Sequence, residues 1–208
     1  MKKFFKWTKG NSHGGDSNSG KHFKYKISVF GEQHGKTVLC GRFLEGEAFG
    51  AYNPTAVDVD ERIVSVDGTQ YTLGFIDTNG GEQFRTMRDL YMKNSQGIVI
   101  VYNVNSRVSF EYVKELYDAL LLLKEIQPEQ ENIPIVIAEN DSPLEGNSTV
   151  SPGEGLALAK KLNCGFIEIS TKTLKNIDEV FYMLAKRITE WNEQQAAMRD
   201  SSRIKNGK

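Results

Sequence analysis

Apolar residues rich in β-branched and aromatic types recur along the chain in six short runs, at residues 25–30, 61–66, 71–77, 98–103, 133–138 and 165–169. Runs of this length and composition predict β-strands. Apolar residues at helical spacing follow most of them, near residues 36–46, 86–94, 108–127, 152–163 and 175–196. The pattern therefore predicts an α/β fold of about six strands and five helices.

The order of these elements predicts how the strands are arranged. Asp67-Gly68 separates the second and third runs, and this dipeptide is typical of a two-residue hairpin, so these two strands should be antiparallel neighbours. The other strands alternate with helices, which require right-handed crossovers between parallel strands. We expect three layers, with a mainly parallel sheet between helices on both of its faces.

The ends of the chain differ in composition from its middle. Residues 8–20 are rich in Gly, Ser and Asn and offer nothing to bury, which is typical of a disordered linker. We therefore expect a disordered basic and Gly/Ser-rich tail over residues 1–23, one folded domain over 24–190, and a C-terminal helix extension and tail over 191–208. The 208 residues, of which 39% are hydrophobic, are enough for one such domain with its own core.

Charge and cysteine content exclude several classes of protein. A net charge of −1 argues against a general nucleic-acid-binding protein. Cys40 and Cys164 have no paired spacing, so we expect no disulfide and no zinc site, and we interpret both as small core residues in a reducing compartment. The chain contains neither an apolar run long enough for a membrane helix nor the apolar core of a signal peptide, so a cytoplasmic location is expected.

The strongest chemical signal is the junction between the first predicted strand and helix. A turn bounded by Gly31 and Gly35 leads into Lys36 and Thr37. Backbone amides in such a turn and at a helix N-terminus bind anions, the lysine adds a charge for terminal phosphates, and the threonine hydroxyl is a ligand for Mg²⁺. Phosphate loops of this kind have four residues between the glycines, but this chain has three: Glu32, Gln33 and His34. We therefore expect a phosphate site with one donor fewer and an added carboxylate.

Three further motifs follow in order. They are Tyr52-Asn53-Pro54-Thr55, then Asp77-Thr78-Asn79-Gly80-Gly81-Glu82, and finally Ser170-Thr171-Lys172. Together with the phosphate loop, these motifs resemble those of the Ras family of small GTPases, and the resemblance covers residues 24–190. It implies a Ras-like G domain with the three-layer fold of P-loop NTPases.

The resemblance also implies a set of site residues for GTP or GDP with Mg²⁺. Lys36 and the amides of residues 33–38 would hold phosphates, Thr37 and Thr55 would ligate Mg²⁺, and Asp77 would act through a Mg²⁺-bound water. The nucleotide-binding residues implied are Gly31, Gln33, His34, Gly35, Lys36, Thr37, Val38, Tyr52, Pro54, Thr55, Asp77, Gly80, Asn140, Asp141, Ser170, Thr171 and Lys172. The positions implied for catalysis are Lys36, Thr55 and Gly81.

Two departures from the family pattern bear on activity. Gly81 occupies the position of the glutamine that orients the attacking water, so we expect hydrolysis to be slow. The base-reading pattern Asn-Lys-x-Asp is replaced by Asn140-Asp141-Ser142-Pro143, so the carboxylate that accepts two hydrogen bonds from guanine is missing. Asp141 or Glu139 is left as an alternative carboxylate for the base.

The resemblance implies effector and regulator proteins as partners, acting through the switch segments. The chain has no cysteine after Cys164, so no prenylation motif is present. The N-terminal run Lys2-Lys3-Phe4-Phe5-Lys6-Trp7 interleaves cations with aromatic rings, a combination that suits peripheral contact with an anionic membrane such as the inner face of the plasma membrane. A solvated tail is the alternative reading of the same run.

These features lead to one main expectation and two alternatives. The main one is a GTP/GDP-binding signalling switch with a degenerate phosphate loop and weak or absent hydrolysis. The first alternative is a pseudo-GTPase, a protein-interaction module with weak or no nucleotide binding. The second is a P-loop nucleotidase with relaxed choice of base. The retained Lys36, Thr37, Thr55 and Asp77 favour a site in use, while the short loop, Gly81 and Pro143 favour the pseudo-GTPase.

Overall fold

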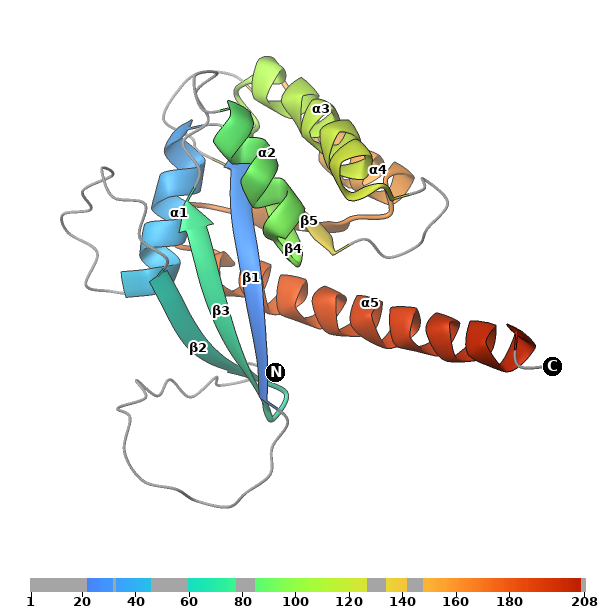
Figure 1. The fold of residues 1–208 in the computed structure, drawn as a ribbon. Helices are drawn as coiled ribbons and strands as arrows, with labels where there is room; N and C mark the ends of the chain where they lie inside the picture. The colour runs from blue at the N-terminus through green and yellow to red at the C-terminus, as the bar shows by residue number, and fades with distance from the viewer. Residues whose placement is uncertain are drawn as a thin grey trace, which may run out of the picture.

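A computed structural model of the chain describes residues 22–31, 33–45, 60–77, 85–126, 134–141 and 148–206. The strands in this part of the chain are β1 (His22–Gly31), β2 (Asp60–Val66), β3 (Thr69–Asp77), β4 (Gly97–Asn103), β5 (Ile135–Asn140) and β6 (Gly165–Ile169). The helices are α1 (Gln33–Glu45), α2 (Arg85–Asn94), α3 (Arg107–Lys124), α4 (Glu154–Lys161) and α5 (Ile177–Asn206). Figure 1 shows the arrangement of these elements.

The strands form one sheet in the order β2-β3-β1-β4-β5-β6. β2 is antiparallel to β3, and the pairs β1–β3, β1–β4, β4–β5 and β5–β6 are parallel. The predicted α/β fold with one antiparallel hairpin strand is confirmed. Because the parallel strands run the same way, their carboxyl ends lie at one edge of the sheet, where α/β proteins bind ligands.

The hairpin between β2 and β3 follows from its two central residues. Val66 pairs with Thr69, so Asp67 and Gly68 alone make the connection. Their φ angles are +51° and +80°, the left-handed values that the tight hairpin turn requires at both positions. Lys186 of α5 donates to the Asp67 carboxylate at 2.9 Å, which ties this turn to the last helix.

Alternation along the central strands divides the core between the two faces of the sheet. On β4, Val99 and Val101 belong to the cluster that contains α1 and α5, while Ile98, Ile100 and Tyr102 belong to the cluster that contains α2, α3 and α4. Side chains on a strand alternate between faces, and helices cover both faces here, so successive residues are all buried. The sheet is therefore the middle of three layers.

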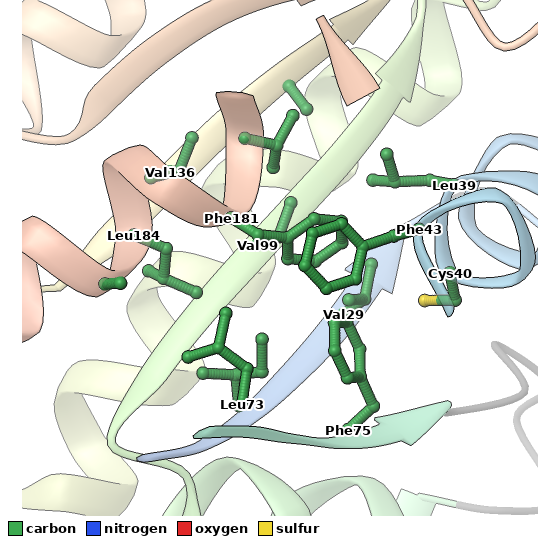
Figure 2. Packing of buried hydrophobic residues seen from close by; sticks show 14 of the residues in the cluster. Val29, Leu39, Cys40, Phe43, Leu73, Phe75, Val99, Val136, Phe181 and Leu184 are labelled. Carbon is green, nitrogen blue, oxygen red and sulfur yellow. The ribbon is translucent and has the colours of Figure 1, made fainter. Parts of the chain in front are cut away.

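Three phenylalanine rings form the centre of the first cluster. Phe43 of α1 lies 4.0 Å from Phe181 of α5 and 5.2 Å from Phe75 of β3, measured between ring centroids. Figure 2 shows these rings packed between α1, α5 and the sheet, with Val29 and Leu73 beside them. Tilted aromatic contacts of this kind stabilise a core beyond the area they bury. α1, which begins the candidate site, is thus fixed to the body of the protein.

The boundaries of β5 and α5 in the structure differ from those predicted from the sequence. β5 was expected over residues 133–138 but runs from Ile135 to Asn140, because Pro134 lacks the amide that a strand interior needs. This shift makes Asn140 the last residue of the strand. α5 was expected to end near residue 196 but continues to Asn206, and its sequence contains neither Gly nor Pro over that length.

α5 extends well beyond the sheet, as Figure 1 shows. Among its described side chains, Ile188 is the last buried one, and the side chains from Ala196 to Ser201 are exposed. Within the described residues, every helix, including this one, is too short or too polar to cross a lipid bilayer.

Candidate nucleotide site

The carboxyl edge of the sheet brings together three of the predicted segments. Gly31 ends β1, Asn140 ends β5, and Ser170 follows β6. Gly31 pairs with Val101 of β4, and Asn140 pairs with both Asn103 of β4 and Ile169 of β6. The predicted phosphate and base segments therefore lie at the same edge, on β1, β5 and β6, with β4 between β1 and β5.

The connection between β1 and α1 is a single residue. β1 ends at Gly31 and α1 begins at Gln33, three residues before the predicted start near residue 36. With only three residues between the glycines, the chain passes almost directly from strand to helix. The first-turn amides of a helix have no acceptor within the helix, so the amides of Gln33, His34 and Gly35 are the donors at this end.

The early helix start changes which groups can contact an anion. An amide four residues into a helix donates to the carbonyl one turn earlier, so the amides of Thr37 and Val38 are used inside α1. Thr37 is partly exposed. The side chain of Lys36 is fully buried, with 0% of its surface exposed.

The two glycines of the loop both lie close to the sheet. Gly31 has a φ of +125°, and a side chain on it would collide with the backbone carbonyl of Val101. A Cβ on Gly35 would lie 3.0 Å from Asn140 Nδ2 and 3.2 Å from Val101 Cγ1. The start of α1 is thus pressed against β4 and β5, an approach that glycine permits.

Asn140 connects the phosphate side of the edge to the base side. It is 3% exposed and touches the start of α1 at Gly35. The backbone amide and the hydroxyl of Thr171 each donate to Asn140 Oδ1 at 3.2 Å. One amide side chain therefore holds the segment after β6 next to the segment after β1.

The remaining base-side residues differ in exposure. Ser170 is buried, and its hydroxyl accepts a hydrogen bond from the Thr173 amide at 3.3 Å. Asp141 and Lys172 are exposed. The Asp141 amide donates to the Ile169 carbonyl at 2.9 Å, which fixes its backbone while its side chain remains exposed to solvent.

Glu139 lies on the other face of the sheet from Asn140. Its carboxylate accepts a hydrogen bond from the hydroxyl of Tyr102, a fully buried residue of the α3 and α4 cluster. Burial, together with Glu139, raises the pKa of Tyr102, so this hydroxyl stays a donor. Of the two carboxylates left open for the base, Glu139 is thus engaged elsewhere, and Asp141 is the exposed one.

Tyr102 and its role were not foreseen from the sequence. It lies in a buried apolar run, 37 positions from Glu139, and nothing in that run marks it as a polar partner. Tyrosine in a buried strand is an ordinary core residue by pattern alone. Only the pairing of β4 with β5 brings the two side chains together.

Several expected site residues fall outside the described part of the chain. These are Tyr52, Pro54, Thr55, Gly80 and Gly81. Asp77 is described as the last backbone position of β3, and Gln33 and His34 as the first of α1, without their side chains. The ligand set expected for Mg²⁺ therefore rests on the Thr37 hydroxyl among the described side chains.

The groups at this edge of the sheet fit the two expected ligands, phosphate and Mg²⁺, to different degrees. First-turn amides of α1 fit a phosphate group, and the lysine at residue 36 fits one once its buried side chain is uncovered. Among the described residues, no cluster of three or more His, Cys, Asp or Glu side chains could hold a metal ion by itself. Mg²⁺ commonly binds through one or two protein oxygens together with phosphate oxygens, and Thr37 is the described residue that would supply such an oxygen.

The cysteines fit the structural role expected for them. Cys40 is buried in the first core cluster, and Cys164 packs against the second. Burial raises the pKa of the Cys164 thiol to about 12, so almost none of it is thiolate near neutral pH.

The sheet order, the antiparallel β2 and the glycine-bounded strand-to-helix junction define a nucleotide-binding α/β domain of the P-loop class. Residues 26–190 match the Ras family. The chain therefore belongs to the Ras family, and this region is a small GTPase-type nucleotide-binding domain. Domains of this family bind GTP and GDP, typically with Mg²⁺.

Proposed function

We propose that the chain is a GTP- and GDP-binding switch with a compacted phosphate site and slow hydrolysis. The observation that carries the proposal is the position of Asn140, which contacts Gly35 of the phosphate segment and accepts two hydrogen bonds from Thr171 of the base segment. A bridge between these two segments is what a bound nucleotide needs, because its phosphates and base lie at opposite ends of one molecule. Effector proteins and an anionic membrane remain the proposed partners.

Different residues would bind the phosphates, the metal ion and the base. First-turn amides of α1 and the ammonium group of Lys36 would bind phosphate oxygens, and the Thr37 hydroxyl would ligate Mg²⁺. The Thr171 and Lys172 segment would contact the base, with the exposed Asp141 as the carboxylate nearest by sequence. Mg²⁺ would supply neutralisation of phosphate charge.

The burial of Lys36 favours a second candidate function, a pseudo-GTPase that serves as a protein-interaction module. A lysine with 0% exposure must be uncovered before its ammonium group reaches a phosphate. If the cost of that change exceeds the gain from binding, the domain keeps its fold without nucleotide. The two functions therefore differ in whether millimolar nucleotide binds.

Thermal unfolding of the full chain separates them. A ligand at 100 times its Kd stabilises the folded state by about 2.7 kcal/mol, which corresponds to several degrees in melting temperature. We expect Mg²⁺ with GTP to raise the melting temperature, and Lys36→Ala to abolish that rise. Insertion of one Gly between Gln33 and His34 should enlarge it, because the insertion restores the usual loop length.

Lys114→Ala is the matched control for loss of one positive charge. Lys114 lies on the surface of α3 and pairs with Asp118 at 2.5 Å, so its loss should leave the nucleotide-dependent rise intact. An unchanged melting temperature of the folded wild type at millimolar nucleotide would refute the switch and support the interaction module.

A further inference from the structure

Tyr102 and Glu139 form a polar pair inside an apolar layer. They are register partners on β4 and β5, and the tyrosine hydroxyl donates to Glu139 Oε2. The ring of Tyr102 is held edge-on by Phe110 of α3, with centroids 5.0 Å apart. A hydrogen bond to a charged acceptor in a poorly solvated place is among the stronger ones that a protein makes.

The first turn of α4 closes over this pair. A Cβ on Gly155 would collide with the Tyr102 hydroxyl and lie 2.9 Å from Glu139 Oε2, so only a glycine fits above them. The neighbouring Glu154 pairs with Arg107 of α3 at 2.8 Å and accepts from the Ser151 amide at 2.7 Å. The partly buried Glu139 carboxylate thus lies between Tyr102 of β4 and the first turn of α4, while α3 packs against the Tyr102 ring.

The next residue along β5 is the bridge of the nucleotide site. Glu139 faces the layer of α3 and α4, while Asn140 faces α1 and contacts Gly35 and Thr171. Successive strand residues point to opposite faces, so a rotation of the strand end would move both side chains. Fixing Glu139 from one face therefore fixes the direction of Asn140 on the other.

We propose that Tyr102 and Glu139 are positioning residues, which hold the end of β5 so that Asn140 can join the phosphate and base segments. The functional half of this inference rests on the proposed nucleotide binding. Neither residue touches the ligand in this scheme. Loss of the pair should loosen the hydrogen bonds that Asn140 accepts from Thr171 on the base side and leave in place the first-turn amides of α1 that would bind phosphate.

Amide hydrogen exchange on the ligand-free full chain tests the positioning directly. Tyr102→Phe removes the donor and keeps the ring. We expect the amides of Thr171 and Asp141, which donate to Asn140 Oδ1 and to the Ile169 carbonyl, to exchange about tenfold faster. Unchanged exchange at both amides would overturn the inference, whatever the nucleotide does.

Three further variants separate positioning from general destabilisation. Tyr25→Phe removes another tyrosine hydroxyl, one that is hydrogen-bonded to Thr189 Oγ1 of α5 at 2.9 Å. This variant should leave the exchange rates of the Thr171 and Asp141 amides unchanged. Glu139→Gln keeps an acceptor for Tyr102 and should keep the slow exchange of the wild type, whereas Glu139→Ala should behave like Tyr102→Phe. Equal acceleration in Tyr25→Phe would show a global effect and overturn the inference.

Binding measurements test the part of the inference that concerns nucleotide binding. We expect Tyr102→Phe to weaken binding of Mg²⁺ with GTP about tenfold and to leave inorganic tripolyphosphate, which has no base, unaffected. Equal affinities of wild type and variant for GTP would overturn this half. A wild type that binds no nucleotide would refute the proposed function, and the exchange result would still decide whether the pair positions Asn140.

Discussion

Gly31 ends β1 in a backbone conformation that glycine adopts and other residues resist. Its φ is +125°, and the carbonyl of Val101 occupies the space a side chain would need. The same residue begins the turn into α1, so one position serves both the sheet and the candidate phosphate site. Fold and site are inseparable at this residue.

Replacement of this glycine should be far more costly than replacement of a glycine with similar φ in open space. Gly31→Ala combines an unfavourable φ with a backbone collision and should lower the free energy of unfolding by about 3 kcal/mol or more. Gly68→Ala, at φ +80° with nothing within 4 Å, should cost about 1 kcal/mol. Urea unfolding of both variants measures the difference, and equal losses would contradict the collision.

Gly81 is a second single residue whose replacement tests function, in this case the rate of hydrolysis. A glycine cannot orient water, so Gly81→Gln should speed single-turnover hydrolysis in a protein that binds GTP. The rate of phosphate release under single-turnover conditions is the measurement. An unchanged rate, with binding preserved, would show that residue 81 does not have the role that the resemblance implies.

At the scale of elements, α5 consists of a packed half and an exposed half. Val180, Phe181, Leu184 and Ile188 are all fully buried, whereas the side chains at residues 196–201 are exposed. The hydroxyls of Tyr25 and Thr189 are hydrogen-bonded, and Trp191 still packs against the second core cluster. The two halves should contribute very differently to stability.

Truncation and substitution can separate those contributions. Removing residues 196–208 should change the free energy of unfolding by about 0.5 kcal/mol or less, because the described side chains of this segment, at residues 196–201, are exposed. Ile188→Ala should cost about 2 to 5 kcal/mol, because it leaves a cavity beside Gly97. Chemical denaturation checks both values. A truncation as costly as Ile188→Ala would mean that the extension packs on the rest of the protein.

For the whole molecule, the sequence was sufficient where local pattern decides structure. Asp67-Gly68 predicted the hairpin, and the alternating strands and helices predicted the three layers, because each depends on residues close together in the chain. The early start of α1 was missed, since removing one loop residue moves a helix boundary in a way that motif spacing does not reveal. The tie between Tyr102 and Glu139 depends on strand pairing, which no local pattern contains.

The exposed part of α5 also determines where a dye or a fused domain attached at Asn206 would lie. A helix rises 1.5 Å per residue, so Asn206 lies roughly 22 Å along the axis from Trp191, which still packs against the core. A straight helix resists bending far more than a Gly- and Ser-rich segment does. A dye or fused domain attached there would keep a set distance and a set orientation relative to the sheet. The described part of α5 thus forms a rigid arm, well suited to distance measurements against labels placed on the body.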